Sequence, residues 1–212
     1  LALAAWLFFA HIAIVHERLR NKGGLKRMGP AILADLRGSG RSFYGMVTAH
    51  VGVAMFVVGV TVLSNYQLEE DVRMSPGDTY EMAGYRFEFL GAKQMPGPNY
   101  MAQRGEFNVY RGDREVTKLY PEKRAYMGGG MPMTEAAIDP GMFRDIYVSL
   151  GESVGNTGDW ALRLYYKPFV RWIWLGAILM ALGGVLAVSD PRYRLASTRA
   201  RKPAADTAAA TA

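Results

Sequence analysis

The sequence has no cysteine and only three histidines among its 212 residues. Without cysteine the chain has no disulfide framework, thiolate nucleophile or redox-active dithiol. The histidines are His11, His16 and His50, so the long segment that follows has none for a zinc site or a catalytic triad. The sequence also has no phosphate-binding glycine loop and no internal repeat. No catalytic residue is assigned, and we expect the later part of the chain to be a docking or shielding module.

Charged residues are missing from residues 43–63, and residues 168–189 hold only Arg171. At 1.5 Å per residue, the first of these runs would span about 30 Å of hydrocarbon as a helix. A third apolar run, residues 1–16, reads as the truncated end of a span that began earlier. A signal peptide is the competing interpretation, but the basic residues follow the apolar run instead of preceding it.

These runs predict a membrane α-helical protein with three visible spans, the first truncated, and an extracytoplasmic antiparallel β domain. We divide the chain into the end of a transmembrane helix (1–16), a basic loop (17–42), a transmembrane helix with His50 (43–63), a β-rich domain that is a small sandwich or barrel (64–167), a transmembrane helix (168–189) and a basic, alanine-rich tail (190–212).

The distribution of lysine and arginine predicts the orientation. Residues 17–42 hold seven basic and two acidic residues, and residues 190–212 hold five and two. Both segments are therefore expected on the cytoplasmic side. Residues 64–167 hold 12 basic and 15 acidic residues, so this segment is expected outside the cytoplasm. The net charge of +6 belongs mainly to the flanks and does not indicate nucleic-acid binding.

Short alternating runs predict strands in the β domain. Two of them, Glu106–Tyr110 and Glu115–Tyr120, flank a turn at 111–114, and Pro121 should end the second strand. The others are Tyr85–Leu90, Asp145–Leu150 and Trp160–Tyr165. The irregular stretch from Met127 to Met133 is expected to be a flexible loop covering a sheet, with Met127, Met131 and Met133 as soft ligands for copper or haem as the alternative.

His50 is the ionisable group inside the uncharged run of residues 43–63. A helical projection puts apolar residues such as Met46 and Val53 on its side, and Gly45, Ala49, Gly52 and Gly59 on the opposite side, where they can pack against another helix. The residues alone favour a neutral His50 hydrogen-bonded to a carbonyl on another helix. Haem ligation and proton transfer are the alternatives. His11 lies at a similar predicted depth, which permits a pair of axial histidines, whereas His16 is expected at the headgroups or in solvent.

Several motifs occur in an order that resembles the C-terminal segment of CcmF, the haem lyase family of cytochrome c-type biogenesis. The resemblance covers residues 42–194. The motifs are Gly45-Met-Val-Thr-Ala-His-Val-Gly-Val-Ala, Gly97-Pro-Asn-Tyr-Met-Ala-Gln-Arg-Gly, Tyr120-Pro-Glu-Lys-Arg, Gly130-Met-Pro-Met-Thr-Glu-Ala-Ala-Ile-Asp and Leu164-Tyr-Tyr-Lys-Pro-Phe-Val-Arg-Trp-Ile-Trp.

The resemblance implies a multi-pass protein of the bacterial inner membrane with residues 64–167 in the periplasm. It implies that His50 is an axial ligand to the iron of a haem b that keeps substrate haem reduced, with quinol as a possible electron source and the second axial ligand upstream. The implied partners are the haem chaperone CcmE, an apocytochrome-binding subunit of CcmH or CcmI type, and apocytochrome c. The thioether-forming site is not expected in this segment. The alternative function is a non-catalytic scaffold of an assembly complex.

Overall fold

The computed structural model describes residues 40–155 and 158–191, together with seven scattered positions among the first 17. The chain forms two compact units, one made of Leu1–Val58 with Trp172–Ala212 and the other of Gly59–Arg171. Most of the predicted span at 1–16, of the basic loop and of the tail therefore lies outside the described residues. His11 and His16 lie there as well.

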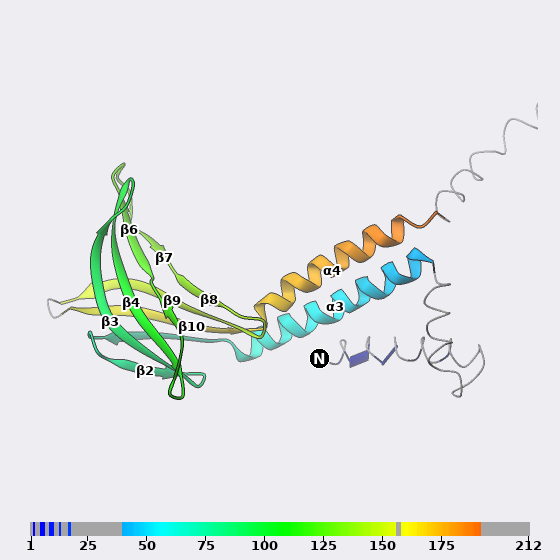
Figure 1. The fold of residues 1–212 in the computed structure, drawn as a ribbon, viewed down its shortest axis with the longest axis horizontal. Helices are drawn as coiled ribbons and strands as arrows, with labels where there is room; N and C mark the ends of the chain where they lie inside the picture. Colours follow the sequence, from blue (N-terminus) through cyan, green and yellow to red (C-terminus); the bar gives the residue numbers. More distant parts are fainter. Residues whose placement is uncertain are drawn as a thin grey trace, which may run out of the picture. The chain divides into compact units, whose positions relative to one another are not determined.

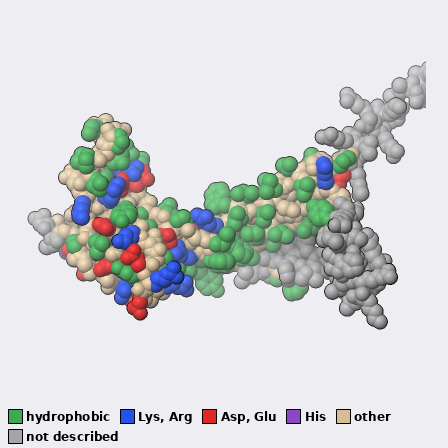
Figure 2. Space-filling view, viewed as in Figure 1, with side chains coloured by type: hydrophobic (Ala, Val, Ile, Leu, Met, Phe, Trp, Pro, Cys, Tyr) green, Lys and Arg blue, Asp and Glu red, His purple; other side chains and the backbone are tan. Residues whose placement is uncertain are grey.

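Two long helices occupy the positions of the predicted second and third spans. Helix α3 covers Arg41–Tyr66 and helix α4 covers Val170–Val188. Both are long and apolar enough to cross a membrane, as judged by length and composition. Figure 2 shows apolar side chains along most of their visible surface. The apolar runs thus become helices that are a few residues longer or shorter than expected.

Glycines let the two helices approach until their backbones touch. A Cβ atom added at Gly52 would lie 2.6 Å from the carbonyl oxygen of Gly176, and one added at Gly183 would lie 2.5 Å from the backbone nitrogen of Ala49. A Cβ at Gly45 would in turn lie 2.5 Å from the carbonyl oxygen of Gly183. Gly45 therefore faces the end of α4 and Gly52 faces its beginning, so the helices run antiparallel. The predicted glycine face of α3 is confirmed as a helix-packing surface.

A carboxylate closes one end of the helix pair. The backbone N–H of Ser42, in the first turn of α3, donates to Asp190 Oδ2 at 2.9 Å. Asp190 follows the last turn of α4 and is only 2% exposed. A carboxylate at a helix N-terminus is stabilised by the unpaired N–H groups and the positive end of the helix dipole. This contact joins the start of one helix to the end of the other.

The second unit consists of two antiparallel sheets (Figure 1). One sheet, called sheet A, has the order β1 (Leu68–Met74), β10 (Asp159–Pro168), β9 (Arg144–Val154) and β8 (Ala137–Pro140). The other, sheet B, has the order β2 (Thr79–Met82), β3 (Tyr85–Pro96), β4 (Tyr100–Arg111), β6 (Glu122–Tyr126) and β7 (Met133–Glu135), with β5 (Arg114–Leu119) also paired to β4.

Large side chains from alternate strand positions fill the space between the sheets. Sheet B contributes Phe89 and Phe107, whose rings stack with centroids 4.9 Å apart, and sheet A contributes Ile146 and Leu164. All four side chains are 0% exposed. The period of two that predicted the strands is therefore the period of core burial. The prediction of a small sandwich or barrel is confirmed as a β-sandwich.

Pro121 divides what would otherwise be one long strand. The segments β5 and β6 lie on either side of it, and both pair with β4. The N–H of Gly105 donates to the carbonyl oxygen of Pro121 at 2.8 Å and bridges the interruption. The predicted end of the second strand at Pro121 is confirmed, but the strand that resumes at Glu122 was not predicted.

Candidate functional site

His50 lies in the middle of α3 and is partly buried. Its Nδ1 atom is 2.7 Å from the carbonyl oxygen of Met46, one turn earlier in the same helix. A carbonyl oxygen can only accept a hydrogen bond, so Nδ1 carries the proton. In a neutral imidazole the lone pair is then on Nε2. The expected acceptor was a carbonyl on another helix, whereas this acceptor belongs to α3 itself.

The imidazole is on a different side of α3 from the glycine contacts. At about 100° per residue, His50 is rotated roughly 130° from the strip formed by Gly45, Ala49 and Gly52. The residues around it on this side, including Met46 and Val53, are apolar and partly buried. Helix α4 therefore packs against a different side of α3, and the described residues of α3 nearest to His50 on its own side are apolar.

The methionine-rich stretch between β6 and β7 takes a different form from the one expected. Met127 is 75% exposed, Met131 is 92% exposed and Met133 is 54% exposed. These side chains point into solvent and do not cover a sheet. Within the described part of the chain, no group of three or more His, Cys, Asp or Glu side chains is arranged to hold a metal ion.

Residues from three separate sequence motifs meet in one charged cluster on sheet B. Glu122 is only 6% exposed, and its two carboxylate oxygens accept from Arg104 Nε at 2.6 Å and Arg124 Nε at 2.8 Å. Arg124 also lies 3.3 Å from Glu135 Oε1, and its guanidinium is 4.8 Å from the ring centroid of Tyr100. We call these five residues the arginine–glutamate cluster. It joins β4, β6 and β7.

The carboxylate and guanidinium groups of the cluster pair with one another. Burial works against the charged form of Glu122, but hydrogen bonds from Arg124 and Arg104 outweigh it and lower the pKa of the carboxyl below its ordinary value. The same hydrogen bond with Glu122 raises the pKa of Arg124. Glu122 therefore stays ionised, and the arrangement fixes three strands. The sequence analysis identified these motifs but did not predict that their residues meet in the folded chain. The opposite charges of these residues were the signal that could have indicated it.

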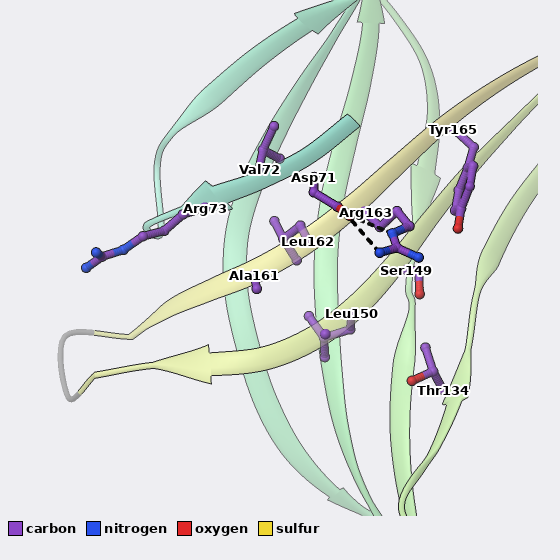
Figure 3. A pocket seen from close by; sticks show the side chains of 11 residues that line it. Asp71, Val72, Arg73, Thr134, Ser149, Leu150, Ala161, Leu162, Arg163 and Tyr165 are labelled. Carbon is purple, nitrogen blue, oxygen red and sulfur yellow. Dashed lines mark hydrogen bonds and ion pairs between the residues drawn. The ribbon is translucent and has the colours of Figure 1, made fainter. Parts of the chain in front are cut away.

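A groove of about 680 Å³ lies along sheet A (Figure 3). Its lining includes Leu150 and Leu162 and the charged pair Asp71 and Arg163, which point toward each other. Arg163 donates from Nε to Asp71 Oδ1 at 2.5 Å and from Nη2 to Oδ2 at 3.0 Å. These hydrogen bonds, the largest cause, lower the pKa of Asp71. The charges of this pair are thus already matched, and sequence reasoning did not find this groove.

Comparison with known proteins finds similarity in the β-sandwich and in most of the rest of the chain. A family model described as the CcmF C-terminal beta-sandwich matches residues 65–168. The cytochrome c-type biogenesis protein CcmF of Pseudomonas aeruginosa is 46% identical over 201 residues, which are 94% of this chain and 29% of that protein. CcmF of Escherichia coli K12 is 46% identical over 194 residues, covering 92% of this chain and 28% of the relative.

The chain belongs to the CcmF family of cytochrome c-type biogenesis proteins. The ccl1 protein of Rhodobacter capsulatus is 39% identical over 210 residues, with 98% of this chain and 30% of the relative covered. A solved structure described as the cytochrome c heme lyase CcmF shares the fold, with a TM-score of 0.59 and 21% identity over 70% of this chain and 25% of that one. The chain spans less than a third of the length of these CcmF relatives.

The family model covers one of the two candidate regions and not the other. The arginine–glutamate cluster lies inside the matched β-sandwich, whereas His50 precedes it in α3. The alignments with the curated CcmF proteins extend well beyond the sandwich, because they cover more than nine tenths of the chain. The recognition of a CcmF C-terminal segment from its motifs is therefore confirmed.

Proposed function

We propose that this chain is the C-terminal part of a cytochrome c maturation haem lyase, in which His50 is an axial ligand of a membrane haem b. The hydrogen bond between His50 Nδ1 and the Met46 carbonyl carries the proposal. It assigns the proton to Nδ1 and the lone pair to Nε2, as an axial ligand to haem iron requires. The apolar neighbours on the same side of α3 suit a porphyrin face.

The surrounding helix supplies orientation and basicity. A ligating histidine whose second nitrogen donates to a carbonyl is held in one ring orientation and binds the metal more strongly. When bound, the haem would supply one-electron transfer, keeping substrate haem ferrous with quinol as a source of electrons. The contribution of this chain is to place Nε2 in an apolar part of the membrane. The second axial ligand would come from a segment of the intact lyase that precedes this one. The alternative is His11 of this chain.

The β-sandwich serves in this proposal as the docking part of the lyase. It would face the periplasm, as the charge distribution of the flanking segments suggests, with α3 and α4 crossing the inner membrane. Its proposed partners are CcmE, apocytochrome c and an apocytochrome-binding subunit of CcmH or CcmI type. Residues 64–167 contain no cysteine or histidine, which suits a docking role. The thioether-forming site would lie elsewhere in the intact lyase.

The absorption spectrum of the protein tests the haem proposal. The protein is purified from its membranes with whatever subunits accompany it, as wild type, as His50→Ala and as Thr48→Ala. Thr48 is a matched control, because it is also a polar, partly buried residue of α3. We expect His50→Ala to lose the b-type Soret band and Thr48→Ala to keep it. An unchanged Soret band in His50→Ala would favour the scaffold function instead.

Docking requires a test that leaves the sandwich intact. Deleting residues 85–120 would remove β3, β4 and β5 together with core side chains such as Phe89 and Phe107, so partner loss would only report unfolding. Replacing Met127 and Met131, which are 75% and 92% exposed, by serine avoids this problem and tests the methionine stretch as the docking site. We expect weaker co-purification of holo-CcmE than with the control Val116→Ser, whose valine is 38% exposed on β5. Equal recovery of holo-CcmE with both variants would show that the methionine stretch is not the docking site.

A further inference from the structure

One end of sheet A gathers a turn and both junctions with the long helices. Leu68, at the start of β1, pairs with Tyr166 near the end of β10. Pro168, the last residue of β10, pairs with Arg144, the first residue of β9. Because β8 ends and β9 begins there, the turn 141–143 lies at the same end. Figure 1 shows this turn beside the point where the chain enters α4.

The turn is fixed to the residue that precedes α4. The N–H of Phe169 donates to the carbonyl oxygen of Phe143 at 3.0 Å, and the two rings lie edge to face with centroids 5.7 Å apart. Phe169 has a φ of +58°, which is costly for a side chain of this size. The backbone is thus turned sharply into α4 while its ring stays against Phe143. The turn and the start of the helix form one local structure.

The surface at this end of the sandwich is apolar. Met142 is 54% exposed and Phe143 is 59% exposed, and Tyr66 and Leu68 are 65% and 42% exposed. Exposed apolar residues scattered singly are ordinary, but a group at one end of a domain marks an interaction surface. Tyr66 and Leu68 flank the junction between α3 and β1, and Met142 and Phe143 lie in the turn between β8 and β9. The strand register brings both places to the same end of sheet A.

Basic side chains and tyrosines lie near the same end of sheet A. The Lys167 ammonium lies 5.1 Å from the ring centroid of Tyr147 and 4.9 Å from that of Tyr165. Arg171 is half-exposed and stands 3.9 Å from Asp145. The acids on the neighbouring strands are themselves engaged, since Asp145 accepts from the Gly141 N–H at 3.0 Å and Asp139 is paired with Arg144. Tyrosines and snorkelling cations next to an apolar helix are the composition of a bilayer interface.

We propose that the β8–β9 turn, residues 141–143, inserts Met142 and Phe143 into the headgroup region of an anionic phospholipid bilayer beside the start of α4. The proposal rests on the proposed function only for the placement of α3 and α4 across the membrane. Met142 and Phe143 enter the boundary between headgroups and acyl chains, and Arg171 and Lys167 face lipid phosphates. Continuity with an apolar helix that begins at Val170 selects the bilayer over a protein partner.

Single cysteines carrying a nitroxide spin label test this proposal, because the chain has no cysteine of its own. Labels are placed at Met142→Cys and Phe143→Cys in the full chain, reconstituted in vesicles of phosphatidylglycerol and phosphatidylethanolamine. Met142 serves as a second position because Phe143 packs against Phe169. Met131→Cys, at a site 92% exposed between β6 and β7, is the aqueous control. Val51→Cys, at a residue 46% exposed in α3, is the control for the membrane interior.

Power saturation then compares the collision of each label with oxygen and with a water-soluble nickel chelate. We expect the ratio of oxygen to nickel accessibility at 142 and 143 to be several-fold higher than at 131 and lower than at 51. Labels at 142 and 143 that match 131, with the label at 51 in the bilayer, would overturn the insertion alone. Labels at 142 and 143 that are shielded from both reagents would show that protein covers the turn, and would also overturn the insertion. An aqueous label at 51 would instead contradict the membrane placement in the proposed function.

Discussion

The packing inside the helix pair and the packing inside the β-sandwich are of opposite kinds. In the helix pair, Gly52 and Gly183 allow backbone atoms of the two helices to come into direct contact, so the interface requires residues without a side chain. In the sandwich, Phe89 and Phe107 fill the space between sheets, so the interface depends on side chains that are large. The first should be sensitive to added atoms and the second to removed atoms. Burial of apolar side chains stabilises domains in water, whereas close backbone packing through small residues is typical of helices in lipid, where we propose that α3 and α4 lie.

The largest expected effect comes from emptying the sandwich core. Phe107 is 0% exposed, and Phe107→Ala should destabilise the sandwich by about 3–5 kcal/mol because the cavity is not refilled. Protection factors from hydrogen exchange of the β4 and β9 amides measure the change. Val116→Ala, at a residue 38% exposed on β5, should leave them within about 0.5 kcal/mol of wild type. Equal losses in both variants would contradict the location of the core.

Adding atoms to the helix interface should have the next largest effect. Gly183→Leu would place a Cβ 2.5 Å from the Ala49 nitrogen, and a backbone contact cannot be relieved by a rotamer change. We expect α3 and α4 to separate, at a cost of about 1–3 kcal/mol. The neighbouring Gly184 has no heavy atom within 4 Å of such a Cβ, so Gly184→Leu is the matched control.

Spin labels on exposed positions of the two helices measure that separation. Val51 is 46% exposed and Ile178 is 54% exposed, and a cysteine at each position gives one distance between α3 and α4. The distance should lengthen in Gly183→Leu and stay at the wild-type value in Gly184→Leu. An unchanged distance in both variants would show that the helices do not pack through their glycines.

The arginine–glutamate cluster should contribute less than the core and in a pH-dependent way. Glu122→Gln should lower the stability of the sandwich at neutral pH by about 1 kcal/mol, because two arginines lose their charged acceptor. The folded protein lowers the pKa of Glu122, so its stabilisation is present above the ordinary glutamate pKa and is lost as pH falls through the lowered value. The difference in protection factors between wild type and Glu122→Gln should therefore close in acid. A difference that persists in acid would show that Glu122→Gln acts through packing and not through the charge of Glu122.

The smallest effect is expected at the rim of the sheet A groove. Asp71 and Arg163 form a bidentate pair in solvent, where screening and side-chain entropy offset most of the attraction. Asp71→Asn should leave the protection factors of β1 and β10 unchanged within error. A clear loss of protection would show that the groove is a structural element comparable to the arginine–glutamate cluster.

The elements that sequence reasoning found are those whose burial follows a local period. Residues 43–63 and 168–189 became α3 and α4, and the five alternating runs became parts of β3, β4, β5, β9 and β10. The glycine face of α3 followed from projecting a single helix. In each case the environment of a side chain repeats at the period of its own element, so nearby residues are enough to predict it.

The elements that were missed depend on residues far away in the sequence. In β6, Glu122 is buried because Arg104 of β4 neutralises it, and a local reading assigns such a residue to the surface. The first residues of β1, at 68–71, are all exposed at the edge of sheet A and therefore show no alternation of burial. His50 was singled out from the sequence, but its hydrogen bond to the Met46 carbonyl, four residues earlier in the same helix, was not predicted.

A redox titration of the proposed membrane haem tests the proposed role of His50 most directly. The protein, purified from its membranes with its accompanying subunits, is compared with His50→Met by following the absorption spectrum across a range of potentials. Methionine is a weaker donor that favours ferrous iron, so histidine–methionine ligation raises the reduction potential. We predict a higher potential and an altered Soret band in His50→Met. A spectrum and a potential identical to those of the wild type would show that His50 does not bind the iron.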